Sequence, residues 1–125
     1  MLCLRHVPET AQTKNLFSKT VIKQIKKGAI LLNYARGEVV DEDALYDALH
    51  RRVIAGAALD VWYRYPSGEE PTHPGHRPFH ELPNVLMTPH VSGWTEGMLA
   101  ARARLIADNI RRISRGEPPE NLIAD

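Results

Sequence analysis

Three short apolar runs alternate with segments of helical periodicity along this 125-residue chain. The runs span residues 29–33, 53–59 and 85–88. Uninterrupted apolar runs of this length are typical of strands that are covered on both faces in a parallel sheet. Because strands that alternate with helices are joined by right-handed crossovers, the sequence predicts an α/β fold with a doubly wound parallel sheet and flanking helices. A short strand at residues 1–4 and a long, proline-rich loop at residues 62–84 complete the predicted order.

Three segments between and after these runs have the apolar spacing of amphipathic helices. The first lies between Ser18, which we expect to cap it by accepting a hydrogen bond from an early backbone N–H, and Gly28. Asp41 is expected to cap the second helix, and the third is expected from about Thr95 to Arg115. The apolar positions are Val21, Ile22 and Ile25 in the first helix, Ala44, Leu45, Ala48 and Leu49 in the second, and Met98, Ala101, Leu105, Ile106, Ile110 and Ile113 in the third.

A polar residue follows each of the three apolar runs, where a parallel sheet forms its ligand crevice. These residues are Arg36, Asp60 and His90. Because the carboxyl ends of parallel strands lie at one edge of the sheet, we expect the three side chains to converge. A cation, a carboxylate and an imidazole in one small volume suggest chemistry on a small acid. The structural alternatives are that Arg36 caps carbonyls or pairs with Glu38, that Asp60 caps a turn or helix, and that His90 ends a plain turn.

The composition is that of an ordinary globular protein of one domain, with 43% hydrophobic and 25% charged residues. A formal net charge of +1 gives no electrostatic case for nucleic acid or membrane partners, and no apolar run approaches the roughly 20 residues that span a bilayer. The single cysteine excludes an internal disulfide framework and favours a reducing compartment. Because the N-terminus shows no secretory-signal pattern, we expect a cytoplasmic location.

Two further clusters of residues have ordinary explanations. His73, His76 and His80 are spaced closely enough to suggest zinc, but they lie among prolines without nearby thiolates, so no metal site is expected. Arginines between residues 102 and 115 could suggest an RNA-binding helix. Basic residues opposite an apolar stripe usually form a solvated face, so we expect no nucleic acid partner.

Eight ordered sequence blocks cover nearly the whole chain. They are HVPET (residues 6–10), KNLF (14–17), KGAILLN (27–33), ARG (35–37), IAGAALDV (54–61), LPNV (82–85), TPH (88–90) and GEPP (116–119). In this order the blocks resemble the cofactor-binding domain of the NAD(P)-dependent D-2-hydroxyacid dehydrogenases. The resemblance implies a partial Rossmann-like fold, NAD or NADP as cofactor, oxidation of a small D-2-hydroxy acid or reduction of the 2-oxo acid, and a homodimer.

The resemblance also implies roles for the residues at the matching positions. It assigns Arg36 to the substrate carboxylate, His90 to proton transfer and Asp60 to the nicotinamide carboxamide. These roles suit the side chains, because a guanidinium matches a carboxylate as a two-point fork and an imidazole titrates near neutral pH. Cofactor contacts are expected from Arg36 and His90 and from Pro8, Tyr34, Ala35 and Gly93.

Two features depart from the family's pattern. The glycine-rich phosphate loop and the substrate domain lie upstream in the family, so residues 1–125 are interpreted as the C-terminal part of a dinucleotide-binding domain that lacks both and binds a dinucleotide weakly alone. The family's glutamate partner of the catalytic histidine is replaced by Tyr65, before Pro66. A local insertion could instead bring Glu70 into that role, so Glu70 joins Arg36 and His90 as a candidate catalytic residue.

A different class of function stays open at this point. Tyr65 and the missing phosphate loop also fit a non-catalytic module that uses the same fold to sense a dinucleotide or to bind a partner. NAD(H)-linked turnover that disappears with His90→Ala would favour the enzyme over the module.

Overall fold

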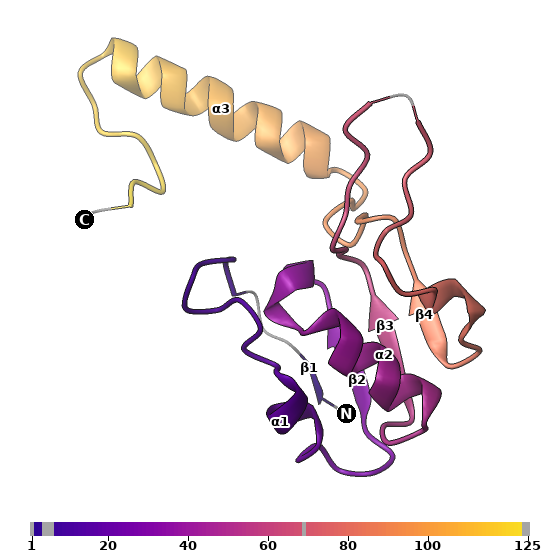
Figure 1. The fold of residues 1–125 in the computed structure, drawn as a ribbon. Coiled ribbons are helices and arrows are strands. Elements are labelled where there is room, and N and C mark those ends of the chain that lie inside the picture. The colour runs from indigo at the N-terminus through magenta and orange to yellow at the C-terminus, as the bar shows by residue number, and fades with distance from the viewer. Residues whose placement is uncertain (1, 4–6, 69, 124–125) are drawn as a thin grey trace. The chain divides into compact units, whose positions relative to one another are not determined.

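The computed structural model describes residues 2–3, 7–68 and 70–123. His6, the first residue of the sequence block at residues 6–10, lies outside the described residues. The chain divides into two compact units, Met1–Ser92 and Gly93–Asp125. The first unit contains the sheet and the helices α1 and α2, and the second contains the long helix α3, as labelled in Figure 1.

The sheet of the first unit has four parallel strands that lie side by side in the order of the sequence. They are β1 (Leu2–Cys3), β2 (Ile30–Asn33), β3 (Gly56–Leu59) and β4 (Val85–Met87). The predicted parallel α/β fold is thus confirmed, with strands two to four inside the predicted apolar runs. Because successive strands step across the sheet in one direction, right-handed crossovers bring α1 and α2 to the same face, as Figure 1 shows.

Helix α1 (Lys19–Ile22) is shorter than predicted, and the capping role expected of Ser18 is wrong. Ser18 is the residue that precedes the helix, but its side chain makes no capping hydrogen bond. After one turn the chain continues through irregular turns to Gly28, whose φ of +89° reverses its direction into β2. Burial of Ile22, which is 2% exposed, holds this short helix in place.

Helix α2 (Glu42–His50) matches its prediction closely. The Asp41 carboxylate accepts a hydrogen bond from the backbone N–H of Ala44 at 2.8 Å, so the predicted cap is confirmed. The four predicted apolar positions are all buried in the core: Ala44, Leu45, Ala48 and Leu49. Sequence pattern and tertiary packing therefore agree over this helix.

The core lies between α1, α2 and one face of the sheet. Leu31, Ala57 and Leu59 point into it, since alternate residues of a strand share a face. On the opposite face Ile30 is 47% exposed and Leu86 is 65% exposed. The expectation that residues 29–33 are covered on both faces is therefore wrong, because both described α-helices of this unit lie on one side.

The long loop after β3 is anchored by one aromatic residue. Its described residues contain a single turn of 3₁₀ helix, η2 (Phe79–Glu81), and no further helix or strand. Phe79 is 1% exposed and packs edge-on against the Tyr46 ring and face-on near the Tyr63 ring, with centroid distances of 5.5 and 6.2 Å. This anchor joins the loop to α2 and returns the chain to β4.

The second unit consists of helix α3 (Met98–Ser114) and a turn that folds back along it. The helix begins three residues later than predicted, after Gly97 at a φ of +81°. The side chain of Asn109 accepts a hydrogen bond from the backbone N–H of Glu120 at 2.7 Å, and the Arg112 side chain donates to the Pro118 carbonyl at 2.7 Å. Across the described residues of both units, none of the helices combines the length and apolar character that crossing a bilayer requires.

Candidate active site at the carboxyl ends of the strands

The turn after β2 presents Arg36 and is organised by Asn33. Asn33 is 2% exposed, and its amide accepts a hydrogen bond from the Ala35 N–H at 3.1 Å and donates to the Arg36 carbonyl at 2.9 Å. The Arg36 side chain is exposed and donates to the Ala35 carbonyl at 2.6 Å. Its pairing with Glu38, one of the structural alternatives, is not observed, because Glu38 pairs with Lys14 at 2.7 Å. Most of the five guanidinium donors therefore remain available to a ligand.

A close backbone contact joins this turn to the segment after β3. A Cβ atom added to Gly37 would collide with the carbonyl oxygen of Trp62, so the two backbones touch where a side chain cannot fit. Gly56 fulfils the same function further down the sheet, where an added Cβ would lie 2.7 Å from the carbonyl oxygen of Asn84. The absence of a side chain at Gly56 thus lets the backbone of the loop at Asn84 pack directly against β3.

Asp60 joins the end of β3 to the segment after β4. Its Oδ1 accepts hydrogen bonds from the Thr88 hydroxyl at 2.6 Å and the Val91 N–H at 2.9 Å, and its Oδ2 accepts one from the Ser92 N–H at 2.8 Å. Burial raises the pKa of Asp60. The hydrogen bonds from the side chains of Ser92 and Thr88 and from the two backbone N–H groups lower the pKa by more than burial raises it, so that the net value is about 2. The buried carboxylate is therefore ionised at neutral pH.

Among the residues that the structure describes, His90 is held by a tyrosine and by no carboxylate. The Tyr65 hydroxyl lies 2.9 Å from Nδ1 of His90, with ring centroids 5.6 Å apart. The same hydroxyl accepts a hydrogen bond from the backbone N–H of Trp62 at 3.1 Å, and the Trp62 indole donates to the Thr88 carbonyl at 2.9 Å. His90 itself has a φ of +60°, a conformation uncommon for residues other than glycine.

Arg36, Asp60 and His90 follow β2, β3 and β4, which are adjacent and parallel, so all three lie beyond the same edge of the sheet. Gly37 and Trp62 touch, and Trp62 reaches His90 through the Tyr65 hydroxyl. The segments that carry the three predicted side chains are thus linked by a continuous series of contacts.

The other predicted site residues differ from one another in exposure and contacts. Glu70 is exposed, and within the described part of the chain its carboxylate makes no hydrogen bond or ion pair. Tyr34 is 38% exposed beside the buried Ala35, and the Pro8 carbonyl accepts a hydrogen bond from the Thr13 hydroxyl at 2.6 Å. Gly93 belongs to the second unit.

Sequence reasoning missed four residues that build this site: Asn33, Trp62, Thr88 and Ser92. A buried amide at the end of an apolar strand was a usable signal for Asn33, since a buried polar group needs hydrogen-bond partners. The other three act through contacts that only the folded loops create.

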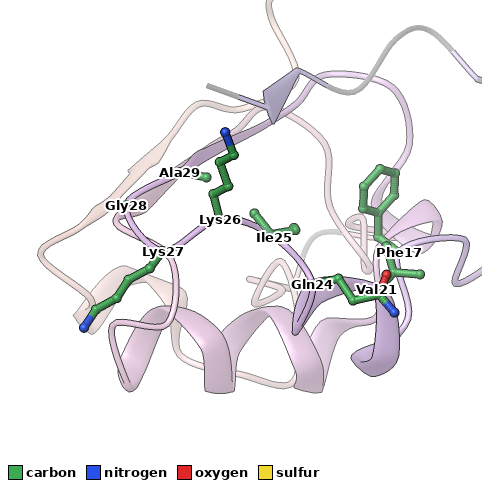
Figure 2. Close-up of a pocket in the computed structure, with 8 residues that line it drawn as sticks. All are labelled: Phe17, Val21, Gln24, Ile25, Lys26, Lys27, Gly28 and Ala29. Carbon is green, nitrogen blue, oxygen red and sulfur yellow. The ribbon is translucent and has the colours of Figure 1, made fainter.

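Two of the hollows in the first unit lie at opposite ends of the strands. One of about 450 Å³ is lined by Trp62, Tyr65, Thr88 and neighbouring loop residues, next to the predicted site. The other, of about 500 Å³, is lined by Val21 of α1, by Phe17 before this helix and by residues 24–29, which lead into β2 (Figure 2). Ala29 precedes the amino end of β2, whereas Arg36 follows its carboxyl end, so the second hollow lies away from Arg36. Among the described residues, no group of histidine, cysteine or acidic side chains is arranged to hold a metal ion.

A guanidinium, a buried carboxylate and an imidazole beyond the carboxyl ends of parallel strands place a ligand site where α/β domains usually bind their ligands. The model of the D-isomer specific 2-hydroxyacid dehydrogenase NAD binding domain matches residues 2–92, up to the end of the first unit. The chain therefore belongs to the D-isomer specific 2-hydroxyacid dehydrogenase family.

Curated relatives and solved structures agree with this assignment. The chain is 41% identical to D-3-phosphoglycerate dehydrogenase of Methanocaldococcus jannaschii, with 94% of this chain and 21% of the relative covered. It is 37% identical to glyoxylate reductase of Korarchaeum cryptofilum, with 94% and 34% covered. A D-isomer specific 2-hydroxyacid dehydrogenase of Lactobacillus delbrueckii, solved in an NAD complexed form, superposes with a TM-score of 0.82 at 31% identity, covering 95% of this chain and 38% of that chain. The chain thus spans between a fifth and a third of the length of these curated relatives.

Proposed function

We propose that this chain supplies the nicotinamide-facing and substrate-facing part of an oxidoreductase that interconverts a small D-2-hydroxy acid and its 2-oxo acid. The observation that carries the proposal is the linked set at one sheet edge: Arg36 exposed, Asp60 buried and ionised, and His90 held through Nδ1. In this proposal residues 1–125 are the C-terminal part of a dinucleotide-binding domain, and the glycine-rich loop and substrate domain belong to other segments of the protein.

Arg36 would bind the substrate carboxylate. Its guanidinium uses one donor on the Ala35 carbonyl, and the remaining donors are exposed. Two parallel N–H···O bonds to a carboxylate would fix the orientation of the acid and place its C2 atom. The Asn33 amide supports this role, because it holds the backbone on both sides of the turn.

Asp60 fits the nicotinamide carboxamide. Its Oδ2 accepts a hydrogen bond from the Ser92 N–H, and a carboxylate oxygen can accept more than one hydrogen bond, including one from an amide N–H. Since the carboxylate is ionised at neutral pH, it is an acceptor throughout the working range. Ala35, Tyr34, Pro8 and Gly93 are proposed as further cofactor contacts, and the choice between NAD and NADP belongs to residues outside this set.

His90 would transfer the proton. Nδ1 faces Tyr65, which leaves Nε2 as the nitrogen that can meet the substrate oxygen. A bound nicotinamide supplies or accepts the hydride at C2 of the substrate. In the reducing direction the imidazolium form of His90 would give its Nε2 proton to the carbonyl oxygen at C2, and in the oxidising direction an imidazole that carries its proton on Nδ1 would take the hydroxyl proton at Nε2.

A homodimer and a cytoplasmic location complete the proposal. The family resemblance supports the homodimer, and the single cysteine supports a reducing compartment. Glu70 is retained as an alternative partner of His90. Because Tyr65 already occupies Nδ1, the geometry favours Tyr65 over Glu70.

The test is an assay of the protein that carries this chain. A panel of short D-2-hydroxy acids with NAD⁺ or NADP⁺, and of 2-oxo acids with the reduced cofactors, should reveal turnover. Arg36→Ala and His90→Ala should each abolish most of it, whereas Arg51→Ala, an exposed arginine at the end of α2, should not. Specific dinucleotide binding without turnover on any acid would reject the enzyme and favour a dinucleotide-sensing module.

A further inference from the structure

The Tyr65 hydroxyl has two neighbours that differ in what they can offer. The backbone N–H of Trp62, 3.1 Å away, can only donate a hydrogen bond. Nδ1 of His90, 2.9 Å away, can donate or accept according to where the imidazole carries its proton. The direction of the second hydrogen bond therefore decides which tautomer of His90 the site selects.

A tyrosine hydroxyl has one hydrogen to donate and an oxygen that accepts. Since the Trp62 N–H already donates to that oxygen, the best use of the remaining hydrogen is donation to a lone pair on Nδ1. A neutral imidazole with an unprotonated Nδ1 carries its proton on Nε2. We propose that Tyr65 is a positioning residue that holds neutral His90 in its Nε2–H tautomer and sets the orientation of its ring.

The Tyr65 hydroxyl is well placed for this role because hydrogen bonds fix the position of the residue that donates to it. Trp62, which donates to it, is 8% exposed, and the Trp62 indole donates to the Thr88 carbonyl at 2.9 Å. Thr88 in turn donates its hydroxyl to Asp60 at 2.6 Å. The hydroxyl that faces Nδ1 is thus connected to the ends of both β3 and β4.

The consequence for the site rests on the proposed function. An Nε2–H group is a hydrogen-bond donor, which suits the carbonyl oxygen of a 2-oxo acid. A carboxylate in place of Tyr65 would accept a hydrogen bond from Nδ1–H and would leave a lone pair on Nε2, which suits the hydroxyl of a 2-hydroxy acid. Tyr65 therefore tunes the resting site toward recognition of the oxo acid.

The direct test is the tautomer of His90 in the ¹⁵N-labelled 125-residue chain, read by long-range ¹H–¹⁵N correlation at a pH where the imidazole is neutral. The chain has six histidines, so His90→Gln identifies the signal. We expect Nε2 to resonate as the protonated nitrogen in the unchanged chain. Tyr65→Glu should move the proton to Nδ1, and Tyr65→Phe should give an averaged signal of both tautomers.

Two controls separate this effect from a general disturbance of the fold. Tyr46→Phe removes a hydroxyl elsewhere in the first unit and should leave the His90 signals unchanged. The indole N–H signal of Trp62 should stay in place in Tyr65→Phe, which shows that the Trp62 contact with Thr88 persists. A protonated Nδ1 in the unchanged chain, or a His90 signal that Tyr65→Phe does not alter, would overturn the proposal.

This readout needs neither cofactor nor turnover, so it is independent of the proposed enzyme activity. In an active enzyme, Tyr65→Phe should lower kcat for reduction of the 2-oxo acid about tenfold, the effect of one lost hydrogen bond of about 1.4 kcal/mol. If activity is present and both kcat and the tautomer are unchanged in Tyr65→Phe, the role of Tyr65 fails while the enzyme stands. If the tautomer behaves as expected but no acid is turned over, the proposed function fails and the tautomer assignment stands.

Discussion

Asp60 and Thr88 share a hydrogen bond of 2.6 Å that connects the ends of two neighbouring strands. Asp60 follows β3 directly, and Thr88 follows β4 directly. The same carboxylate accepts from two backbone N–H groups just beyond His90. An ionised side chain that is 6% exposed therefore shapes the segment that carries the imidazole.

Asp60→Asn should destabilise this arrangement, because an amide cannot accept from donors on both of its terminal atoms. Its NH₂ group would oppose a backbone N–H of Val91 or Ser92. We expect the free energy of unfolding to fall by about 1–3 kcal/mol, the cost of a lost charged hydrogen bond and an unsatisfied buried group. Denaturant unfolding at neutral pH measures it. Asp43→Asn, at a side chain that is 79% exposed, is the matched control, and an equal loss in both variants would contradict the prediction.

Acid should weaken the same contact in a defined window. The hydrogen bonds to Asp60 lower its pKa from 3.8 to about 2. A carboxylate with a lowered folded-state pKa contributes stability that is complete above the unfolded value and is lost as the pH falls toward the folded value. The difference in stability between the unchanged chain and Asp60→Asn should therefore shrink between about pH 4 and about pH 2. Unfolding curves of both proteins across this range give the comparison. A difference that stays constant with pH would show that Asp60 does not titrate in this way.

Three glycines offer a test of the backbone contacts. Gly37→Ala and Gly56→Ala would each drive a Cβ atom into a carbonyl oxygen, that of Trp62 or Asn84. We expect each to lower the free energy of unfolding by about 1–3 kcal/mol, the usual cost of overpacking. Gly68→Ala is the control, since no described atom lies within 4 Å of its added Cβ. Thermal or denaturant unfolding should rank Gly68→Ala nearest to the unchanged chain, and the reverse order would contradict the backbone contacts.

Elements whose signal is local were predicted well. Helix α2 combines a capping aspartate with four buried apolar residues at helical spacing, so sequence pattern and packing select the same segment. Helix α1 was predicted too long because its apolar spacing continues to Ile25, while only one turn forms. Gly28, which was expected to end the helix, lies six residues beyond Ile22, so it turns the chain toward β2 and does not end α1.

In the candidate site, too, some residues could be predicted from the sequence and others could not. Arg36, Asp60 and His90 could be placed at one edge because parallel topology alone brings the ends of β2, β3 and β4 together. The partner of His90 could not be decided between Tyr65 and Glu70, because that depends on how a loop of irregular conformation folds over the strand ends. The amide of Asn33 was overlooked since its partners, Ala35 and Arg36, are backbone groups of a turn.

Asn33 provides the last prediction, which separates the shape of the Arg36 turn from its charge. Asn33→Asp keeps an acceptor for the Ala35 N–H but loses the donor to the Arg36 carbonyl, and it places a carboxylate at a position that is 2% exposed. Asn33→Ala loses both hydrogen bonds without adding a charge. We expect the alanine variant to lose about 1–3 kcal/mol of unfolding free energy, and the aspartate variant to lose more at neutral pH than at acid pH, where its carboxyl group becomes neutral. Unfolding at two pH values resolves the two variants. If both lose the same amount at both pH values, the Asn33 amide does not hold the turn by donating to the Arg36 carbonyl.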